Sequence, residues 1–232
     1  MNNINSIFRI ELFNQSNTSE IKDYALSFNQ SIAKLLLDYL VAIPTLIVLA
    51  PVLLLTAIMI KLESSGPILF KQKRVGLNGK IFDMYKFRSM YSDADEKIHQ
   101  EQIQAYYNHE LDEEESVKLK NDPRITKVGR VLRLYSLDEI PQLLNVLKRD
   151  MSIVGPRPVP IYEADLYKLW QSERLNSLPG ITGLWQVSGR SEVSFDEQLR
   201  LDIRYIRNQS LWLNIKILLK TIPVVLSRKG AG

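Results

Sequence analysis

Residues 35–60 read LLLDYLVAIPTLIVLAPVLLLTAIMI, and this almost uninterrupted apolar run decides how the rest of the chain is organised. Asp38 is its only charged residue, and Lys34 and Lys61 bracket it. As a straight helix the run would extend about 39 Å, which exceeds the roughly 30 Å hydrocarbon core of a bilayer. The simplest interpretation is therefore a single transmembrane helix.

Two prolines in the run allow a different arrangement. Pro44 and Pro51 each lack an amide donor, and Ala50–Pro51 lies in the middle. A kink there would permit a broken, re-entrant helix that enters and leaves by the same face, if protein or headgroups satisfy the freed carbonyls. The lysines at both ends give the positive-inside rule little asymmetry to choose between these topologies. A buried helix of a soluble core is less favoured, because the run is too long and too uniformly apolar.

The composition excludes several classes of site. The chain has 232 residues, a net charge of +4, no cysteine and two histidines, His99 and His109, in an acidic region. Disulfides and thiolate zinc sites are excluded, and a Ser-His-Asp triad is disfavoured. Residues 1–31 are polar and lack the parts of a signal peptide, so we expect a weakly ordered extension there.

A basic hairpin is predicted directly after the apolar run. The segments 68–74 and 80–88 flank the sequence GLNG at 76–79, and Asn-Gly between β-prone segments is a strong hairpin signal. One acid, Asp83, accompanies six cations: Lys71, Lys73, Arg74, Lys80, Lys86 and Arg88. The hairpin is either a solvated basic ribbon or a surface that contacts anionic headgroups or a phosphate ligand.

Two adjacent carboxylates, Asp138 and Glu139, mark a second feature, the sequence SLDEIP at 136–141. Ser136 and Glu139 match the capping box, which predicts a helix start with both acids ionised and partly exposed. Four cations precede this turn and favour a phosphate ligand: Arg124, Lys127, Arg130 and Arg133. Ile140, Leu143, Leu144 and Leu147 then follow the spacing of an amphipathic helix.

The remaining chain alternates loops with predicted helices. The stiff loop 155–158 presents Arg157, whose guanidinium suits phosphate. The glycine-punctuated loop 179–190 carries Gln186 and Arg190 and would let backbone approach a ligand closely. Helices are predicted at 161–175, 195–207 and 210–227, and the last is either an interfacial amphipathic helix or a core helix.

Four motifs in order give the chain a family resemblance. They are KFRSM at 86–90, SLDE at 136–139, VGPRP at 154–158 and PGITG at 179–183, behind a proline-broken apolar segment. The set resembles the bacterial sugar transferases, the monotopic polyprenyl-phosphate phosphoglycosyl transferases, over residues 32–228. Two positions depart from the family pattern: Ala50 replaces a common Ser, and Leu178 replaces a common Arg.

The resemblance implies an α+β, mostly helical monotopic membrane protein. Residues 1–31 would be the polar extension, 32–62 the re-entrant helix with its kink at Ala50–Pro51, and 63–232 a cytoplasmic catalytic domain with interfacial amphipathic helices. It implies the compact form of the family, at the bacterial inner membrane. The expected partners are a UDP-sugar, polyprenyl phosphate and inner-membrane lipids, with no nucleic acid and with a homodimer as an option.

The implied reaction transfers a sugar-1-phosphate from the UDP-sugar to polyprenyl phosphate and releases UMP. Asp138 would be the nucleophile that carries the phosphosugar, and Mg²⁺ would be bound by Asp138 and Glu139. Glu139 would bind the metal or position the lipid phosphate. The segment 183–190 weakly favours a hexose, glucose or galactose. The phosphate- and substrate-binding candidates are Arg133, Arg157, Lys86, Arg88, Gln186 and Arg190.

Two other functions remain open on the residues alone. Asp93 and Asp95 form a D-x-D motif, as in metal-dependent glycosyltransferases, although the chain before them is a membrane segment and not a nucleotide-binding domain. A membrane-anchored scaffold that binds anionic lipid would explain the charges but not the ordered motifs.

Overall fold

The computed structural model describes residues 31–91, 97–107, 122–189 and 193–227. Its helices are α3 (Ile32–Glu63), α4 (Lys97–Tyr107), α5 (Lys127–Leu134), α6 (Leu143–Leu147), α7 (Ile161–Ala164), α8 (Leu169–Ser172), α9 (Phe195–Arg207) and α10 (Leu211–Ser227). The strands are β1 (Leu69–Val75), β2 (Ile81–Phe87), β3 (Ser152–Val154), β4 (Val159–Pro160) and β5 (Gly180–Thr182). Short 3-10 helices are η1 (Leu77–Gly79), η2 (Leu137–Gln142), η3 (Glu173–Asn176) and η4 (Trp185–Val187). The prediction of a mostly helical α+β fold is confirmed.

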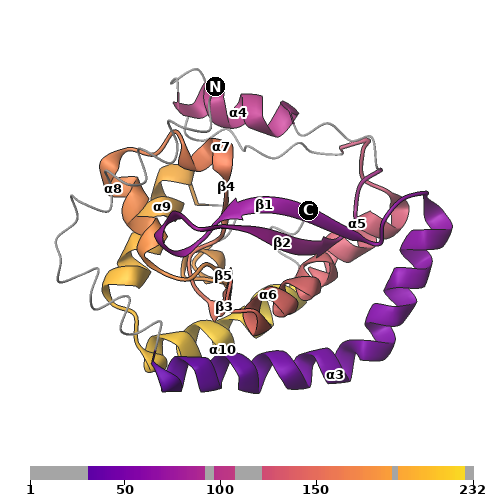
Figure 1. The fold of residues 1–232 in the computed structure, drawn as a ribbon, viewed down its shortest axis with the longest axis horizontal. Coiled ribbons are helices and arrows are strands. Elements are labelled where there is room, and N and C mark those ends of the chain that lie inside the picture. Colours follow the sequence, from indigo (N-terminus) through magenta and orange to yellow (C-terminus); the bar gives the residue numbers. More distant parts are fainter. Residues whose placement is uncertain (1–30, 92–96, 108–121, 190–192, 228–232) are drawn as a thin grey trace.

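The apolar run forms one continuous helix, α3, with Pro44 and Pro51 inside it. Figure 1 shows that α3 changes direction partway along, so that it borders the rest of the protein on two sides. Proline removes a helix hydrogen bond and crowds the preceding turn, which accounts for a bend. The expected break at Ala50–Pro51 is therefore a bend within an unbroken helix, and both residues are exposed.

α3 is long and apolar enough to cross a membrane, and most of it is not covered by protein. Its exposed large apolar side chains include Leu40, Ile47, Val48 and Leu54, each more than 60% exposed. A core helix of a soluble protein would bury such residues. The alternative of a soluble core helix is therefore wrong for α3.

The N-terminal end of α3 is attached to the body of the protein by buried charges. Lys34 Nζ donates to Ser152 Oγ at 2.6 Å and to the carbonyl of Val154 at 2.8 Å. Asp38 Oδ1 accepts from Ser152 Oγ at 2.8 Å and from the backbone N–H of Ile153 at 3.0 Å. The two charges that interrupt the apolar pattern thus fasten this end of the helix to β3.

The C-terminal end of α3 is attached to the same body at a different place. The Arg88 guanidinium donates to the carbonyl of Ile60 at 3.2 Å and to that of Ser64 at 2.7 Å. Glu63 accepts from the first backbone N–H groups of α5, at 2.7 Å from that of Lys127. Both ends of the apolar helix are therefore bound to one folded unit.

The predicted hairpin is confirmed. β1 and β2 pair in antiparallel register from Leu69 opposite Phe87 to Val75 opposite Ile81. Asn78 and Gly79 both have positive φ, at 54° and 77°, as the Asn-Gly pair predicts. β4 pairs with the other edge of β1, which gives the sheet order β2-β1-β4.

A second, two-stranded sheet joins the stiff loop to the glycine-rich loop. β3 and β5 run parallel, with Ser152 opposite Gly180. A Cβ on Gly180 would lie 2.1 Å from the backbone N of Gly155, and one on Gly183 would lie 2.5 Å from the carbonyl oxygen of Gly155. These glycines therefore allow two backbones to approach one another.

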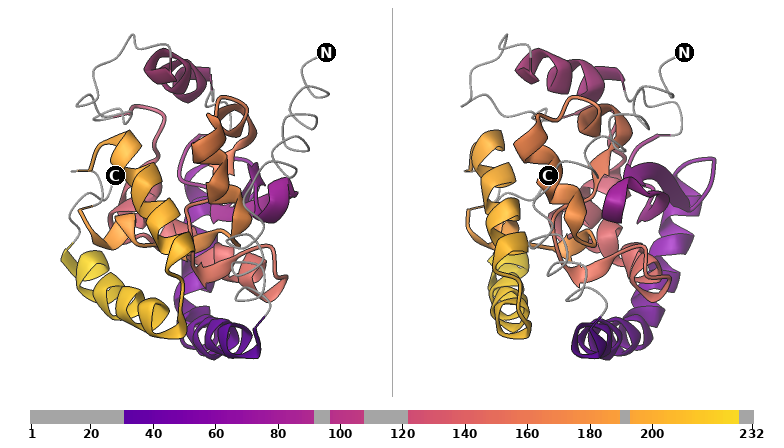
Figure 2. Two further views of the ribbon diagram at one scale, coloured as in Figure 1. Left: turned by 90° about the vertical axis from the view of Figure 1, so that its left-hand side faces the viewer. Right: turned by 60° about the vertical axis from the view of Figure 1, so that its left-hand side comes forward.

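The C-terminal helices differ in how well the sequence predicted them. The segment 161–175 is not one helix, because α7 and α8 are separate short helices followed by η3. α9 and α10 form as expected. α10 combines both predicted characters, since Ile217 is buried in the core while Trp212, Leu219 and Leu226 are more than 60% exposed. α10 and the first part of α3 lie at the same end of the molecule, opposite α4 (Figure 2).

The main core lies between α3, the hairpin and α10. It combines Ala42 of α3 with Phe82 and Met84 of β2, Val146 of α6 and Ile217 of α10. A smaller cluster around Ile60, Phe87 and Leu132 contains Leu137, the residue before the paired acids. The acidic turn is thus packed against the second half of the apolar helix.

Candidate active site

The acidic turn is a 3-10 helix with an unusual entry. Ser136 has the left-handed conformation, with φ of 55°, and its side chain makes no capping hydrogen bond. The predicted capping box is therefore wrong, because a left-handed residue directs its hydroxyl away from the N–H groups that it would have to cap. Pro141 lies inside η2, and α6 begins only at Leu143.

Glu139 is the common acceptor for two cations from different parts of the fold. Its Oε1 lies 3.1 Å from Lys86 Nζ on β2 and 3.4 Å from Arg157 Nη2 on the stiff loop. Burial alone would raise the pKa of Glu139, but Lys86 and Arg157 outweigh it and bring the pKa to about 2. Glu139 is therefore ionised at any physiological pH.

Asp138 has a contrasting environment. It is buried, at 8% exposure, and burial raises the pKa of its carboxyl above the usual range, with the charge of Glu139 adding to the effect. Lys86, Arg133 and Arg157 counteract that rise. The sequence predicted two similar, partly exposed acids, whereas the structure gives them pKa values shifted in opposite directions.

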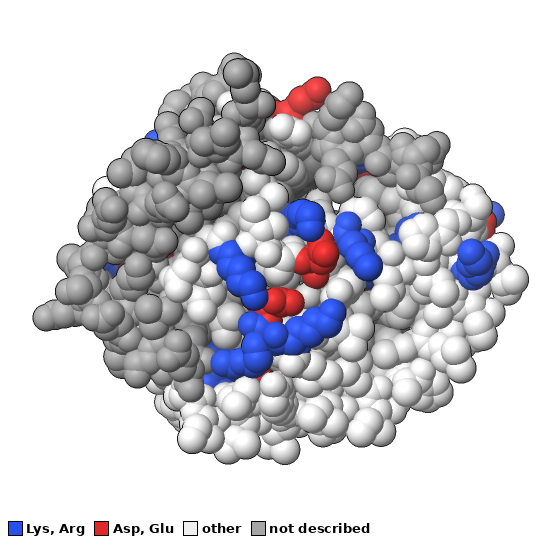
Figure 3. Space-filling model, in the orientation of Figure 1, with Lys and Arg blue, Asp and Glu red and all other residues white. Residues whose placement is uncertain are grey.

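Arg133 is directed toward Asp138 by its surroundings. Its Nε donates to Ser89 Oγ at 3.0 Å, and Ser89 belongs to the segment that follows the hairpin. Burial lowers the pKa of Arg133, and the charge of Asp138 raises it. Three cations from β2, α5 and the stiff loop therefore lie around the acidic pair. Figure 3 shows basic side chains gathered around a few acidic ones on the face that the hairpin occupies.

The side chains present fit a magnesium ion that is held mainly by its substrate. Within the described residues no three His, Asp or Glu side chains come close enough to form a metal cage. Mg²⁺ in phosphoryl-transfer sites often takes one or two carboxylates and fills its remaining positions with phosphate oxygens and water. Asp138 can supply such a carboxylate, whereas Oε1 of Glu139 already accepts from two cations.

Comparison with known proteins identifies the family. The profile described as bacterial sugar transferase matches residues 29–228. The chain belongs to the bacterial sugar transferase family.

Several known proteins are similar to this chain. It is 43% identical to the galactosyl transferase CpsE of Streptococcus agalactiae, over 88% of this chain and 44% of that protein. It is 42% identical to the exopolysaccharide production protein ExoY of Sinorhizobium fredii, over 86% and 88%. It is 48% identical to the undecaprenyl-phosphate galactose phosphotransferase of Salmonella typhimurium, over 73% and 35%. The chain spans less than half the length of two of these sugar transferases and most of the third.

Three predicted site residues of this sugar transferase lie outside the cluster or outside the described residues. Arg88 is 5% exposed, and its guanidinium donates to carbonyls at the end of α3. It therefore binds the end of this helix to the segment after the hairpin. Gln186 Nε2 donates to the carbonyl of Ile181 at 3.0 Å, within its own loop. Arg190 lies outside the described residues, as do Asp93 and Asp95 of the D-x-D motif.

One cation near the site was not singled out from the sequence. Arg74 shares a face of the hairpin with Lys86, because side chains two residues apart on a strand point the same way and Phe70 is opposite Lys86. Arg74 Nη1 donates to the carbonyl of Pro158 at 3.2 Å, beside the loop of Arg157. The charge of Arg74 also lowers the pKa of Lys86. The period of two along β1, read with the hairpin register, would have indicated Arg74.

Proposed function

We propose that this chain is a phosphoglycosyl transferase that transfers a sugar-1-phosphate from a UDP-sugar to polyprenyl phosphate and releases UMP. The observation that carries the proposal is the Asp138–Glu139 turn, surrounded by three cations and packed through Leu137 against the apolar helix. A relative at 48% identity is named for phosphotransfer of galactose to undecaprenyl phosphate, which supports the same reaction class.

The two acids take different roles in this proposal. The carboxylate of Asp138 attacks the sugar-bearing phosphorus of the UDP-sugar, and the bond from that phosphorus to the bridging oxygen breaks. UMP leaves with the electron pair, and the phosphosugar remains on Asp138 as an acyl phosphate. A phosphate oxygen of the lipid carrier then attacks the same phosphorus and restores the carboxylate. Burial supports Asp138 as nucleophile, since a carboxylate with a raised pKa is the more basic and more nucleophilic of the pair.

Glu139 and the cations organise the phosphates. A carboxylate that approaches a diphosphate meets like charge, so fixed positive charge must offset the repulsion. Lys86, Arg133 and Arg157 supply it, and Glu139 orients Lys86 and Arg157 through one of its two carboxylate oxygens, Oε1. Arg74 is close enough to Lys86 to add its charge to the positive potential around the phosphates. Magnesium, when bound at Asp138, would neutralise further charge on the transferring phosphoryl group.

The attachment of α3 supports a monotopic arrangement. Lys34 and Asp38 fasten one end to β3, and Arg88 and Glu63 fasten the other end beside the hairpin. A helix whose two ends are bound to one compact domain returns to the side on which that domain lies. The exposed apolar surfaces of α3 and α10 would then lie in a single leaflet, with the catalytic residues at its cytoplasmic surface. We propose the inner membrane as its location.

The names of the relatives support a choice among the UDP-sugar donors. CpsE is named a galactosyl transferase, and the Salmonella relative is named for galactose. A UDP-hexose, with galactose first, is therefore the donor that we propose. ExoY is named for exopolysaccharide production, and initiation of an extracellular polysaccharide is the corresponding role for this chain.

The decisive experiment identifies the nucleotide that the enzyme releases. Membranes that contain the protein are incubated with UDP-galactose, UDP-glucose or UDP-N-acetylglucosamine, together with Mg²⁺ and undecaprenyl phosphate. UMP with a lipid diphosphosugar is the expected product. UDP would instead indicate a glycosyltransferase that uses the D-x-D motif, and an absence of turnover with every donor would favour a lipid-binding scaffold.

A further inference from the structure

The loop that presents Arg157 is bound from behind by a buried ion pair. Arg174 Nη2 donates to the backbone carbonyl of Arg157 at 3.1 Å. Arg174 Nε donates to Asp202 Oδ2 on α9 at 2.7 Å. Burial raises the pKa of Asp202 to about 6, and the charge of Arg174 and the nearby backbone N–H of Arg157 partly offset that rise. The backbone carbonyl of Arg157 is therefore held by the Arg174–Asp202 pair.

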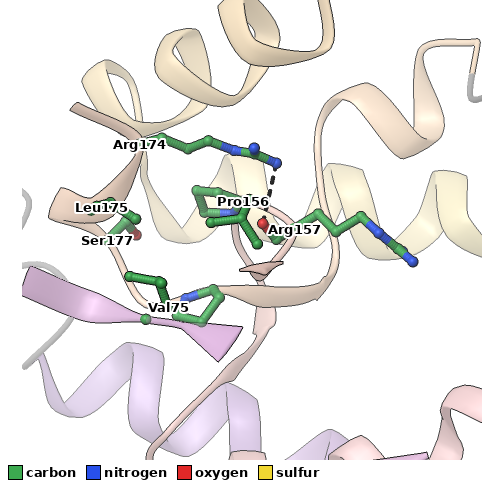
Figure 4. A pocket seen from close by; sticks show the side chains of 9 residues that line it. Val75, Pro156, Arg157, Arg174, Leu175 and Ser177 are labelled. Carbon is green, nitrogen blue, oxygen red and sulfur yellow. Dashed lines mark hydrogen bonds between the residues drawn. The ribbon is translucent and has the colours of Figure 1, made fainter. Parts of the chain in front are cut away.

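The side chain of Arg157 points the opposite way from this pair. Figure 4 shows Arg174 reaching the carbonyl of Arg157 while the guanidinium of Arg157 extends away, toward the other side of the loop. There it lies 3.4 Å from Glu139 and is 38% exposed. The cavity behind the loop measures about 10 Å³, which is room for about one water molecule. The substrate therefore has to approach on the side of Glu139, and the ion pair supports the loop from the rear.

The pair is more deeply buried than a surface bridge and has further partners. Arg174 is 6% exposed and Asp202 is fully buried. Arg174 Nη1 also donates to Tyr167 Oη at 2.6 Å and lies 3.5 Å from Glu163. Removing charges from water costs several kcal/mol per ion, so a buried pair adds little stability over an apolar packing of the same volume. Its better-attested use is to fix one arrangement among several, which here is the position of the Arg157 loop.

We propose that Arg174 and Asp202 form a positioning unit for Arg157, which sets the reach of its guanidinium toward Glu139 and the donor diphosphate. The inference rests on the proposed function and adds two residues that do not touch substrate. Pro156 and Pro158 fix φ on either side of Arg157, and the ion pair fixes the peptide groups between them. A rigid loop matters because, within the described residues, the half-exposed side chain of Arg157 has a single ion pair, with Glu139. A misplacement of about 1 Å can cost a hundredfold in rate.

A double-mutant cycle with Arg157→Ala tests the inference. Arg174→Lys keeps the charge but cannot bind Asp202 and the Arg157 carbonyl together, and Asp202→Asn removes the anion. Each should lower kcat/KM for the UDP-sugar about 10- to 100-fold in the wild-type background. In the Arg157→Ala background each should lower it no more than about twofold, because the residue through which they act is absent. Losses that multiply in the double variants would overturn the proposal.

Arg207→Lys is the matched control. Arg207 binds Glu173 with two hydrogen bonds, at 2.8 and 2.6 Å, and so also links α9 to η3, but it makes no contact with Arg157. We expect Arg207→Lys to leave kcat/KM unchanged. An equal loss in Arg207→Lys would mean that weakened packing of α9 explains the effect, and the positioning role would be rejected.

Tyr167→Phe covers the case in which the buried variants do not fold. It removes one hydroxyl partner of Arg174 and changes volume little, so it should give a smaller loss with the same dependence on Arg157. If Tyr167→Phe, Arg174→Lys and Asp202→Asn all fail to fold, the pair is only structural and the inference is wrong.

Hydrogen exchange separates this inference from the proposed function. A peptide over residues 153–159 reports the amides of Gly155, Arg157 and Val159, since its first two residues lose their label and the prolines have no N–H. Exchange should quicken about tenfold or more in Arg174→Lys and stay unchanged in Arg207→Lys. If wild-type enzyme releases no UMP but exchange responds, the proposed reaction fails and the positioning stands. If UMP is released and neither exchange nor the cycle responds, the positioning fails alone.

Discussion

Lys86 Nζ lies 3.1 Å from Glu139 Oε1, and both side chains are largely buried, at 17% and 20% exposure. This contact joins the basic hairpin to the acidic turn across 53 positions of sequence. Glu139 therefore holds cations in place, whereas the adjacent Asp138 is the acid that we propose as the nucleophile.

Glu139→Gln should therefore reduce turnover by about a hundredfold, because Lys86 and Arg157 lose the charge that orients them. The stability of the variant should also depend on pH differently from that of the wild type. The folded pKa of Glu139 is about 2, below its usual 4.5, so its ionisation stabilises the fold above pH 4.5, and this contribution is lost as pH falls toward 2. Thermal unfolding between pH 2.5 and 6 should show a steeper acid loss in wild type than in Glu139→Gln. Equal slopes would contradict the assignment.

Asp138→Asn should abolish the covalent phosphosugar adduct that intact-mass spectrometry detects after donor is added without lipid acceptor. It should at the same time raise the unfolding temperature at neutral pH. The pKa of Asp138 is raised, so the ionised form destabilises the fold above the usual aspartate pKa, and an amide removes that cost. The stabilisation should fade below pH 4. Asp83→Asn, on the exposed hairpin, is the control that keeps the adduct. An adduct that survives in Asp138→Asn would exclude this residue as nucleophile.

Arg88→Lys should lower stability and leave the substrate site intact. A single ammonium cannot replace hydrogen bonds to Pro67, Ile60 and Ser64, and each unsatisfied buried carbonyl costs about 1–3 kcal/mol. The unfolding temperature measured in detergent should fall by several degrees. KM for the UDP-sugar, measured on the folded fraction, should stay unchanged. Arg130→Lys, at an exposed position, should do neither. A large rise in KM for Arg88→Lys would return Arg88 to the phosphate site.

Gly180→Ala should prevent folding. Its new Cβ would lie 2.1 Å from the backbone N of Gly155, where no flexible side chain can move aside, and overpacking of this kind costs 3 kcal/mol or more, about the top of the usual range. Gly76→Ala is the comparison, because its Cβ would meet the ring of Phe82 at 3.2 Å and requires only a small adjustment. Expression and thermal unfolding distinguish the two. A stable Gly180→Ala would show that β3 and β5 can separate without loss.

The chain contains no cysteine, which makes its topology directly testable. Gln30→Cys and Ser65→Cys place single thiols near the two ends of α3. Both should react with a membrane-impermeant maleimide only after the cytoplasmic side is made accessible, because the two ends are bound to one domain. Reaction of the two thiols from opposite sides would restore the single transmembrane span.

The sequence predicted those parts of the fold that local pattern controls. The hairpin followed from Asn78–Gly79 and its flanking strands, and α10 followed from its one-sided apolar pattern. α9 formed at the predicted bounds, 195–207. The capping box at Ser136 failed because Ser136 has the left-handed conformation, which local rules do not favour for serine. The segment 161–175 failed as one helix because buried contacts of Glu163 and Arg174 interrupt it.

The sequence predicted which residues belong to the candidate site better than it predicted the contacts between them. The ordered motifs identified Asp138, Glu139 and Arg157, but the division of charge between the acids depends on contacts 53 and 18 positions away in sequence. The prediction that Arg88 binds phosphate or substrate also lacked these long-range contacts. The motif around Arg88 contains two cations, and only the folded chain shows that Lys86 faces Glu139 while Arg88 faces the end of α3.

The fastenings of α3 have a consequence for biosynthesis. Lys34 binds Ser152 across 118 positions, and Glu63 binds the start of α5 across 64. Because synthesis proceeds from the N-terminus, the apolar helix leaves the ribosome long before either partner exists. The insertion machinery thus receives a hydrophobic segment whose final shape is not yet specified. In the monotopic arrangement proposed above, its course through the lipid would become fixed only after β3 has been translated and folded. The topology would then be set late, by tertiary folding, and not by insertion itself.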